Sequence, residues 1–188
     1  RDSEFEIGDI DTDKFFRELT QMNHSVGGMD GFGPEDLTMV SRYSVKFIVD
    51  MLNAIELGAN WPSDINKGRA SFLAKDPNKL DDPNAYRPLM VLPIIYRRWA
   101  SMRHSDLDPW KAKWKLKEMF AGNGSNGAED AAWTTALQFE TAALEKEDLT
   151  GGVADIYKCF DQVLRKLLEV LLQIGGMPKR VYGAYLRY

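Results

Sequence analysis

The chain has 188 residues, 44% of them hydrophobic, and a formal net charge of −4 at pH 7. That length can bury a core in one domain or two small lobes, and the sequence has no run of about 18 apolar residues to span a membrane. The acidic start, RDSEFEIGDIDTDKFF, lacks the basic and apolar regions of a signal peptide, and the single Cys159 excludes an internal disulfide. We therefore expect an intracellular protein, nuclear or cytoplasmic, that is not secreted and has no membrane partner.

The first third of the chain predicts a turn followed by one long helix. After an acidic segment (1–24), SVGGMDGFG (25–33) is a glycine-rich turn, and Pro34 suits the first position of a helix. Apolar side chains then recur at three- and four-residue spacing, which predicts an amphipathic helix that ends at Gly58. The residues of this apolar stripe are Leu37, Val40, Tyr43, Phe47, Met51 and Ile55.

The middle of the chain predicts a strand, a polar loop and a basic helix. GRASFLAK (68–75) is short and bounded by turn residues, which favours a strand, whereas DPNKLDDPNAY (76–86) has the composition of a loop or hairpin tip. A helix is expected after Pro93. The basic residues of this region are Arg87, Arg97, Arg98, Arg103, Lys111, Lys113, Lys115 and Lys117. They indicate either a phosphate-binding surface or a solvated helix face, and the sequence leaves both open.

The last third predicts a loop, two helices around a strand, and a final helical piece. AGNGSNGAED (121–130) is the loop, AAWTTALQFETAALEKE (131–147) a helix, and GGVADIY (151–157) a strand. FDQVLRKLLEVLLQIGG (160–176) then predicts a helix, and another begins near Pro178. The alternation of helices and strands is typical of a mixed α/β protein.

Asp155 attracts attention because it lies near the end of the predicted strand. A carboxylate at a strand terminus can project a divalent-metal ligand into a cleft, whereas the simpler interpretation is a turn or helix cap. Two-metal nucleotidyl transfer is a reaction that needs such a carboxylate.

Lys75 and Arg87 lie on either side of the polar loop. Pro88 restricts Arg87 to an extended backbone, from which its guanidinium can meet an anion with little reorganisation. If the loop is a hairpin tip, the two cations could converge on one triphosphate. The alternative is two exposed cations on a turn.

The remaining candidate sites have simpler explanations. Trp110 and Trp114, in WKAKWKLK, could stack on bases, although helix packing is the simpler interpretation. His24 and His104 have no Cys/His cluster nearby, which argues against a zinc site, and neither glycine-rich loop continues into the GK[ST] of a phosphate-binding loop.

Taken in order, four stretches resemble motifs of reverse transcriptases of the non-LTR retrotransposon and group II intron type. GGMDGFGPEDL resembles their Pro-Gly-x-Asp-Gly opening motif, with Gly27 in place of proline. RASFLAKDPNKLDDPNAYRPL resembles their fingers motif, with Ala74 where proline is usual before Lys75. FAGNGSNGAEDA resembles the next motif without its usual Gln and Arg, and ADIYKCFDQV resembles the first catalytic palm motif. The resemblance covers nearly the whole chain from about residue 25.

This resemblance implies an α/β (α+β) fold, namely the fingers and partial palm of a right-hand polymerase. Such a fold is helix-rich with a small, incomplete antiparallel sheet. Residues 25–145 would form the fingers with the start of the palm, and residues 146–188 would form the partial palm.

The resemblance also implies roles for five residues. Asp155 would bind the two catalytic magnesium ions, and the backbone carbonyl of Ile156 would complete a metal shell. Phe160 would lie under the incoming sugar and reject a 2′-hydroxyl by collision. Lys75 and Arg87 would grip the nucleotide triphosphate. The expected partners are an RNA template, a DNA primer and deoxynucleoside triphosphates.

The function implied is that of an RNA-directed DNA polymerase of a mobile element. The family's second catalytic motif, Tyr-x-Asp-Asp, is absent from this sequence, so we expect the isolated chain to be inactive. One alternative is a degenerate or domesticated module that binds nucleic acid or a partner without catalysis. Another is an unrelated helical interaction domain.

Overall fold

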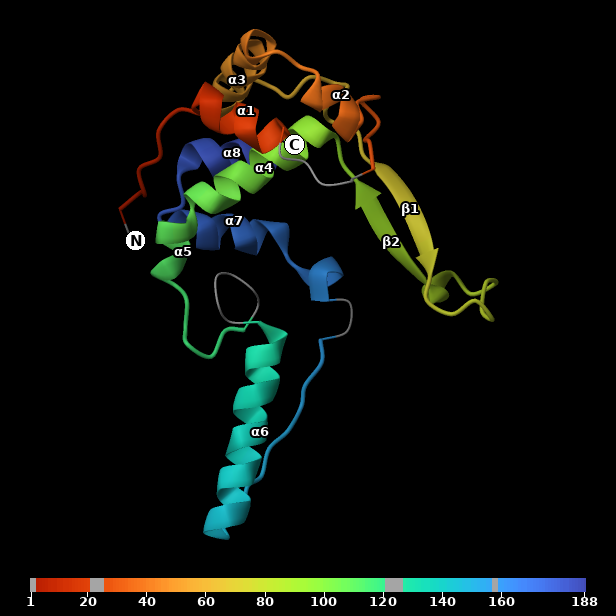
Figure 1. Ribbon diagram of the computed structural model, residues 1–188, viewed down its shortest axis with the longest axis vertical. Helices are drawn as coiled ribbons and strands as arrows, with labels where there is room; N and C mark the ends of the chain where they lie inside the picture. The colour runs from red at the N-terminus through yellow and green to blue at the C-terminus, as the bar shows by residue number, and fades with distance from the viewer. Residues whose placement is uncertain (1–2, 21–25, 121–126, 157–158) are drawn as a thin grey trace. The chain divides into compact units, whose positions relative to one another are not determined.

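The computed structural model describes residues 3–20, 26–120, 127–156 and 159–188, with only the backbone of Phe160 and Asp161. The elements are α1 (Thr12–Thr20), α2 (Pro34–Thr38), α3 (Arg42–Glu56), β1 (Arg69–Ala74), β2 (Tyr86–Val91), α4 (Ile94–Asp106), α5 (Asp108–Ala112), α6 (Ala128–Glu145), α7 (Arg165–Ile174) and α8 (Lys179–Arg187), with 3₁₀ turns at Pro83–Ala85 and Cys159–Gln162 (Figure 1). The described chain is helix-rich with a small antiparallel sheet, which confirms the coarse α+β prediction.

The chain divides into two compact units. Unit 1 comprises Arg1–Asp108 and Glu169–Tyr188, and unit 2 comprises Pro109–Leu168. The expected motif-based regions, 1–24, 25–145 and 146–188, stay a prediction. In the described part of the chain, none of the helices has both the length and the hydropathy that a membrane crossing requires.

The core of unit 1 is made by helices α1, α3, α4 and α8. Its most deeply buried side chains include Phe15, Leu19, Val45, Leu52, Ile94, Met102 and Val181. Burial of these apolar groups is the main force that holds the helices together. The N-terminal segment, predicted only as acidic, thus contributes helix α1 and two core side chains, Phe15 and Leu19.

The single helix predicted across residues 34–58 is wrong, because it divides into α2 and α3. Ser41 lies between them in an extended conformation, and its hydroxyl accepts a hydrogen bond from the Ser44 N–H at 3.1 Å. A serine in this position begins a new helix, because it satisfies an otherwise unpaired backbone donor. Pro34 does begin α2, as predicted.

The break also changes which face of α3 is buried. The side chains that enter the core are Val45, Val49, Leu52, Ile55 and Glu56. Two residues of the predicted apolar stripe, Tyr43 and Phe47, are instead exposed and pack against each other edge to face, with ring centroids 5.2 Å apart.

An aromatic cluster lies beside this helical core. Trp61, Tyr96, Trp99 and Tyr188 form a connected set of ring contacts, in which Tyr96 and Tyr188 stack with centroids 3.6 Å apart. The Trp61 indole N–H donates to the backbone carbonyl of Ala184 at 2.8 Å, which ties the loop after α3 to α8. Burial raises the pKa of Tyr96 to about 12.

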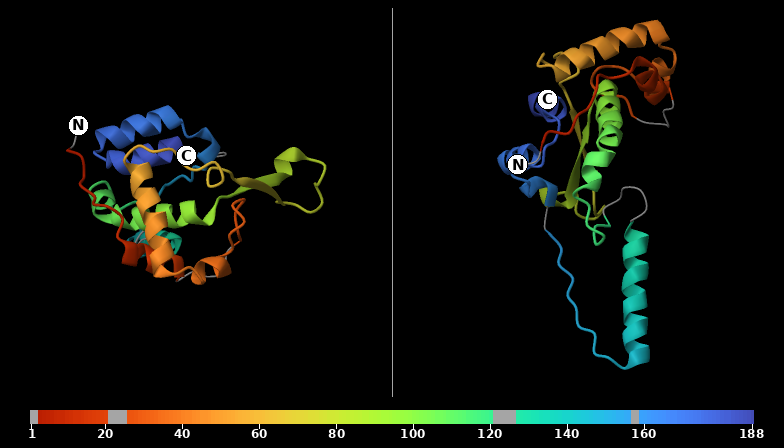
Figure 2. Two further views of the ribbon diagram at one scale, coloured as in Figure 1. Left: turned by 90° about the horizontal axis from the view of Figure 1, so that it is seen from above. Right: turned by 90° about the vertical axis from the view of Figure 1, so that its left-hand side faces the viewer.

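The two strands form an antiparallel hairpin that projects from the helices of unit 1 (Figures 1 and 2). Residues 68–75 were predicted as a strand, and β1 confirms this. The second strand, β2, was predicted only conditionally, as the far side of a possible hairpin.

Unit 2 contains the long helix α6, which begins and ends close to the predicted bounds. Asp130 lies in its first turn, where the carboxylate accepts a hydrogen bond from the Gly127 N–H at 2.7 Å. Acidic groups at this end are favourable because of the exposed helix N–H groups.

The predicted strand at 151–157 is wrong over its described part, because residues 151–156 form no regular element. A strand needs a neighbour to pair with, and β1 and β2 are the strands of the described chain and pair with each other. Val153, in the middle of this segment, is fully exposed. The helix predicted at 160–176 is shorter, since a 3₁₀ turn at Cys159–Gln162 precedes α7.

Candidate nucleotide-binding hairpin

The hairpin places Lys75 and Arg87 on the same face. In the register of β1 and β2, Leu73 lies opposite Arg87 and Ala74 lies opposite Tyr86. The Lys75 N–H donates to the Ala85 carbonyl at 2.7 Å, which extends the ladder by one residue. Side chains two residues apart on a strand share a face, so Lys75 lies beside Leu73 and diagonal to Arg87. The hairpin that the sequence offered as one possibility is therefore present, and the convergence of the two cations on a triphosphate stays a prediction.

The tip between these cations is a series of turns held by its own polar groups. The Asp76 carboxylate accepts a hydrogen bond from the Asn78 N–H at 2.9 Å, and the Asp82 carboxylate accepts one from the Asn84 N–H at 2.8 Å. The Tyr86 hydroxyl donates to the Leu80 carbonyl at 2.9 Å. These local bonds fix the loop, as expected from its Asp, Asn and Pro content.

Both cationic side chains of the hairpin are at the surface. Lys75 is exposed, and its ammonium donates to the Asn84 carbonyl at 3.3 Å. Arg87 is also exposed, and the described residues give its guanidinium no carboxylate partner. A guanidinium on an extended strand beside a lysine can bind a phosphate group with little rearrangement.

The residues predicted for metal binding lie in unit 2, whereas the hairpin belongs to unit 1. Asp155 and Ile156 are exposed and lie in the irregular segment 151–156. The backbone of Phe160 is part of the 3₁₀ turn Cys159–Gln162, and the predicted role of its side chain lies outside what the structure describes.

The oxygen donors at Asp155 and Ile156 are of the kind that magnesium prefers. A carboxylate and a backbone carbonyl can each supply an oxygen ligand, and magnesium commonly binds through one or two carboxylates while it keeps several waters. Within the described ranges, no three His, Cys, Asp or Glu side chains gather at one point. The donor types therefore fit one magnesium ion, and a pair of ions needs a further carboxylate.

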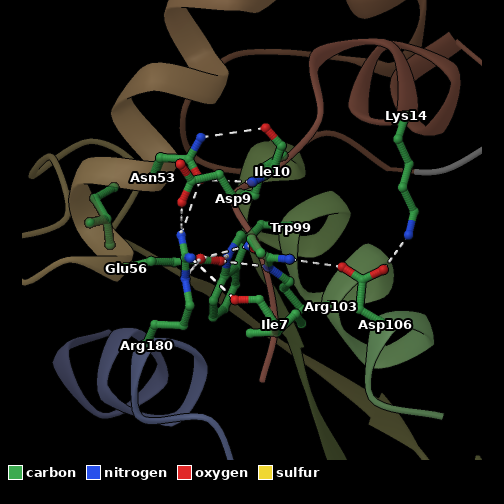
Figure 3. Close-up of polar contacts among 12 residues, drawn as sticks. Ile7, Asp9, Ile10, Lys14, Asn53, Glu56, Trp99, Arg103, Asp106 and Arg180 are labelled. Atoms are coloured by element: carbon green, nitrogen blue, oxygen red, sulfur yellow. Dashed lines mark hydrogen bonds and ion pairs between the residues drawn. The ribbon is translucent and has the colours of Figure 1, made fainter. Parts of the chain in front are cut away.

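A buried polar cluster in unit 1, which the sequence did not indicate, is centred on Glu56 (Figure 3). Glu56 is 4% exposed, and its Oε1 accepts hydrogen bonds from the Trp99 indole at 2.8 Å and from Arg103 Nε at 2.7 Å. Its Oε2 accepts from Arg103 Nη2 and Arg180 Nε, each at 2.7 Å. We call Glu56, Trp99, Arg103 and Arg180 the Glu56 cluster.

The Glu56 cluster also fixes the segment that precedes α1. Arg103 donates to the Gly8 carbonyl at 3.0 Å, and Arg180 donates to the Asp9 carboxylate at 2.7 Å. Burial lowers the pKa of Arg180, but its bonds to Asp9 and Glu56 outweigh that effect and raise the pKa overall. The cluster thus joins helices α3, α4 and α8 to the N-terminal segment, and we interpret it as structural.

The arginines of α4 are buried or half-buried and bond to other segments of unit 1, so they do not form the solvated helix face that was one of the two interpretations of the sequence. Arg103 is 3% exposed and bonded to Glu56, while Arg98 pairs with Glu18 at 3.7 Å. Arg97 is half-buried and donates to the Val26 carbonyl at 2.6 Å. A pattern of charges along one helix cannot reveal that its partners come from distant segments.

Comparisons with protein-family models, with curated proteins and with solved structures found no match.

Proposed function

We propose that the β1–β2 hairpin binds the triphosphate of an incoming deoxynucleotide, as part of an RNA-directed DNA polymerase. The observation that carries this proposal is the strand register, which sets Lys75 and Arg87 on one exposed face beside a fixed tip. The order of the four sequence motifs gives the reason to choose a polymerase among the proteins that bind nucleotides.

The chemistry of this face suits a triphosphate. Arginine can donate two parallel hydrogen bonds to phosphate oxygens, and lysine adds a mobile positive charge. The hairpin tip holds itself through its own hydrogen bonds, so little conformational entropy is lost when a ligand binds.

The metal-binding part of the proposal concerns Asp155 with Ile156. They would hold magnesium, which when bound supplies positive charge to activate a 3′-hydroxyl and stabilise the departing pyrophosphate. Phe160 stays the predicted discriminator against ribonucleotides.

The proposal is tested by ultraviolet crosslinking of the chain to radiolabelled dTTP, with unlabelled dTTP as competitor to give an apparent Kd. Loss of one charge-assisted contact typically costs about 1.5–3 kcal/mol. We therefore expect Lys75→Ala or Arg87→Ala to weaken binding at least about tenfold, and the double substitution to weaken it further.

Arg69→Ala is the matched control, because Arg69 is an exposed cation on the same face of the same hairpin. It lies opposite Val91, about 20 Å along the strand from Lys75. We expect this substitution to change the Kd less than about threefold. Retained binding in the Lys75→Ala/Arg87→Ala protein would refute the assignment of the hairpin. Nucleotide binding by a complete gene product that does not extend primers would favour the non-catalytic alternative.

A further inference from the structure

A lysine-rich segment with two tryptophans opens unit 2. Residues 109–117, PWKAKWKLK, hold four lysines and no acidic residue, although the whole chain has a net charge of −4. Lys113, Lys115 and Lys117 are exposed. We call residues 109–117 the Trp/Lys segment.

The structure favours a surface role for the Trp/Lys segment. Helix α5 ends at Ala112 and has no buried residue, and Trp114 lies beyond it with 47% of its surface exposed. The predicted alternative, helix packing, would bury this ring. Trp114 thus differs from other exposed apolar side chains, such as Trp133, by its setting among lysines, where a flat ring and positive charges stand together.

The segment holds its aromatic groups in a defined conformation. The Trp114 N–H donates to the Lys111 carbonyl at 3.0 Å, and the Lys113 N–H donates to the Trp110 carbonyl at 3.2 Å. The two indole rings have centroids 6.4 Å apart and are tilted by 56°. Because the turns and the ring pair are formed already, a ligand would find the aromatic surface ordered.

From these observations we infer that the Trp/Lys segment binds single-stranded nucleic acid, with Trp114 stacked on a base and the lysines facing the backbone phosphates. The lysines favour a polyanion as the ligand, and the exposed Trp114 indole favours a polyanion whose bases are free to stack on the indole. An acidic peptide would attract the lysines but would offer the Trp114 indole no flat ring to stack on. In a duplex the bases already stack on one another. This inference does not rest on the proposed function of the hairpin.

The test is fluorescence anisotropy with fluorescein-labelled uridine RNA and thymidine DNA homopolymers of about 12 nucleotides, a length that one compact site covers. We expect Trp114→Ala to weaken binding about 5- to 150-fold, the range that corresponds to loss of one stacked base. The RNA and DNA arms show which single strand is preferred, and binding of either one depends on Trp114.

Trp133→Ala is the matched control, because Trp133 is 68% exposed on α6 of the same unit but has Glu129 and Asp130 in the preceding turn. We expect it to change the Kd less than about twofold. Replacing Lys113, Lys115 and Lys117 together by glutamine should reduce the slope of log K against log salt by about 2. The Lys75→Ala/Arg87→Ala protein should keep its Trp114-dependent binding, which separates this test from that of the hairpin.

Three results would overturn the inference. One is equal loss of binding in Trp114→Ala and Trp133→Ala, and another is an unchanged salt slope in the triple glutamine protein. The third is binding of a polyglutamate peptide of the same charge as tightly as the RNA. All the substituted positions are exposed, so circular dichroism should show an unchanged fold in each variant.

Discussion

Replacing Glu56 by glutamine is expected to destabilise unit 1 severely. Glu56 accepts four hydrogen bonds, three of which come from the guanidinium groups of Arg103 and Arg180. Glutamine keeps the shape of the side chain but removes its negative charge and one of its two acceptor oxygens. Arg103, which is 3% exposed, then stays buried without its main counter-charge.

The expected magnitude follows from the burial of this pair. Removing one partner of a buried ion pair typically costs about 3–5 kcal/mol, because the remaining charge is left uncompensated. With a urea m-value of about 2 kcal/mol/M, the unfolding midpoint should fall by about 1.5–2.5 M.

The assay is urea unfolding followed by far-ultraviolet circular dichroism. Asp50→Asn is the control on the same helix, because the Lys46–Asp50 pair is more than half exposed. That control should lose less than about 0.5 kcal/mol. If Glu56→Gln shifts the midpoint no more than Asp50→Asn does, the interpretation of the Glu56 cluster as the joint between helices is refuted.

Two further predictions concern the same unit. Burial raises the pKa of the Tyr96 hydroxyl to about 12, so the folded protein holds the hydroxyl proton more tightly than the unfolded chain does. The protonated Tyr96 therefore contributes its full stabilisation below about pH 10, and this stabilisation is lost as the pH rises towards 12. Thermal melts between about pH 10 and 12 should show the free energy of unfolding fall by about 1–2 kcal/mol, allowing for solvent screening, and most of this fall should be missing in Tyr96→Phe. The same fall in the unmodified protein and in Tyr96→Phe would contradict this prediction. Gly28→Ala should destabilise the protein by about 1–3 kcal/mol in chemical denaturation, because a Cβ there would lie 2.6 Å from the Cα of Pro93. Gly8→Ala, which meets nothing within 4 Å, is the control, and equal effects of the two substitutions would count against the close packing at Pro93.

The hairpin could be anticipated from the sequence because its determinants are local. Turn-forming residues at 76–86 lie between two extended segments, and Pro88 restricts the backbone before it. Local signals also located α6 and the start of α2 at Pro34. What the sequence could not give was the break at Ser41, since the apolar spacing continues across it.

The remaining errors arise from long-range partners. The residues GGVADIY have strand propensity, but propensity becomes a strand only where a neighbour offers backbone hydrogen bonds. Arg103 carries no local mark of burial, because its partner Glu56 lies 47 residues earlier in the chain. The same reasoning explains why the basic region divides into buried or half-buried arginines in α4 and exposed lysines after α5.

The most direct test of the polymerase assignment is primer extension on an RNA template by the complete gene product that contains this sequence, with deoxynucleotides and magnesium. We expect extension by the unmodified protein and a loss of at least about 100-fold in Asp155→Asn, which removes the charge of the proposed metal ligand. Asp148→Asn, an exposed carboxylate seven residues earlier in unit 2, should extend primers at the unmodified rate. An Asp155→Asn protein that extends the primer as fast as the unmodified protein would contradict the assignment.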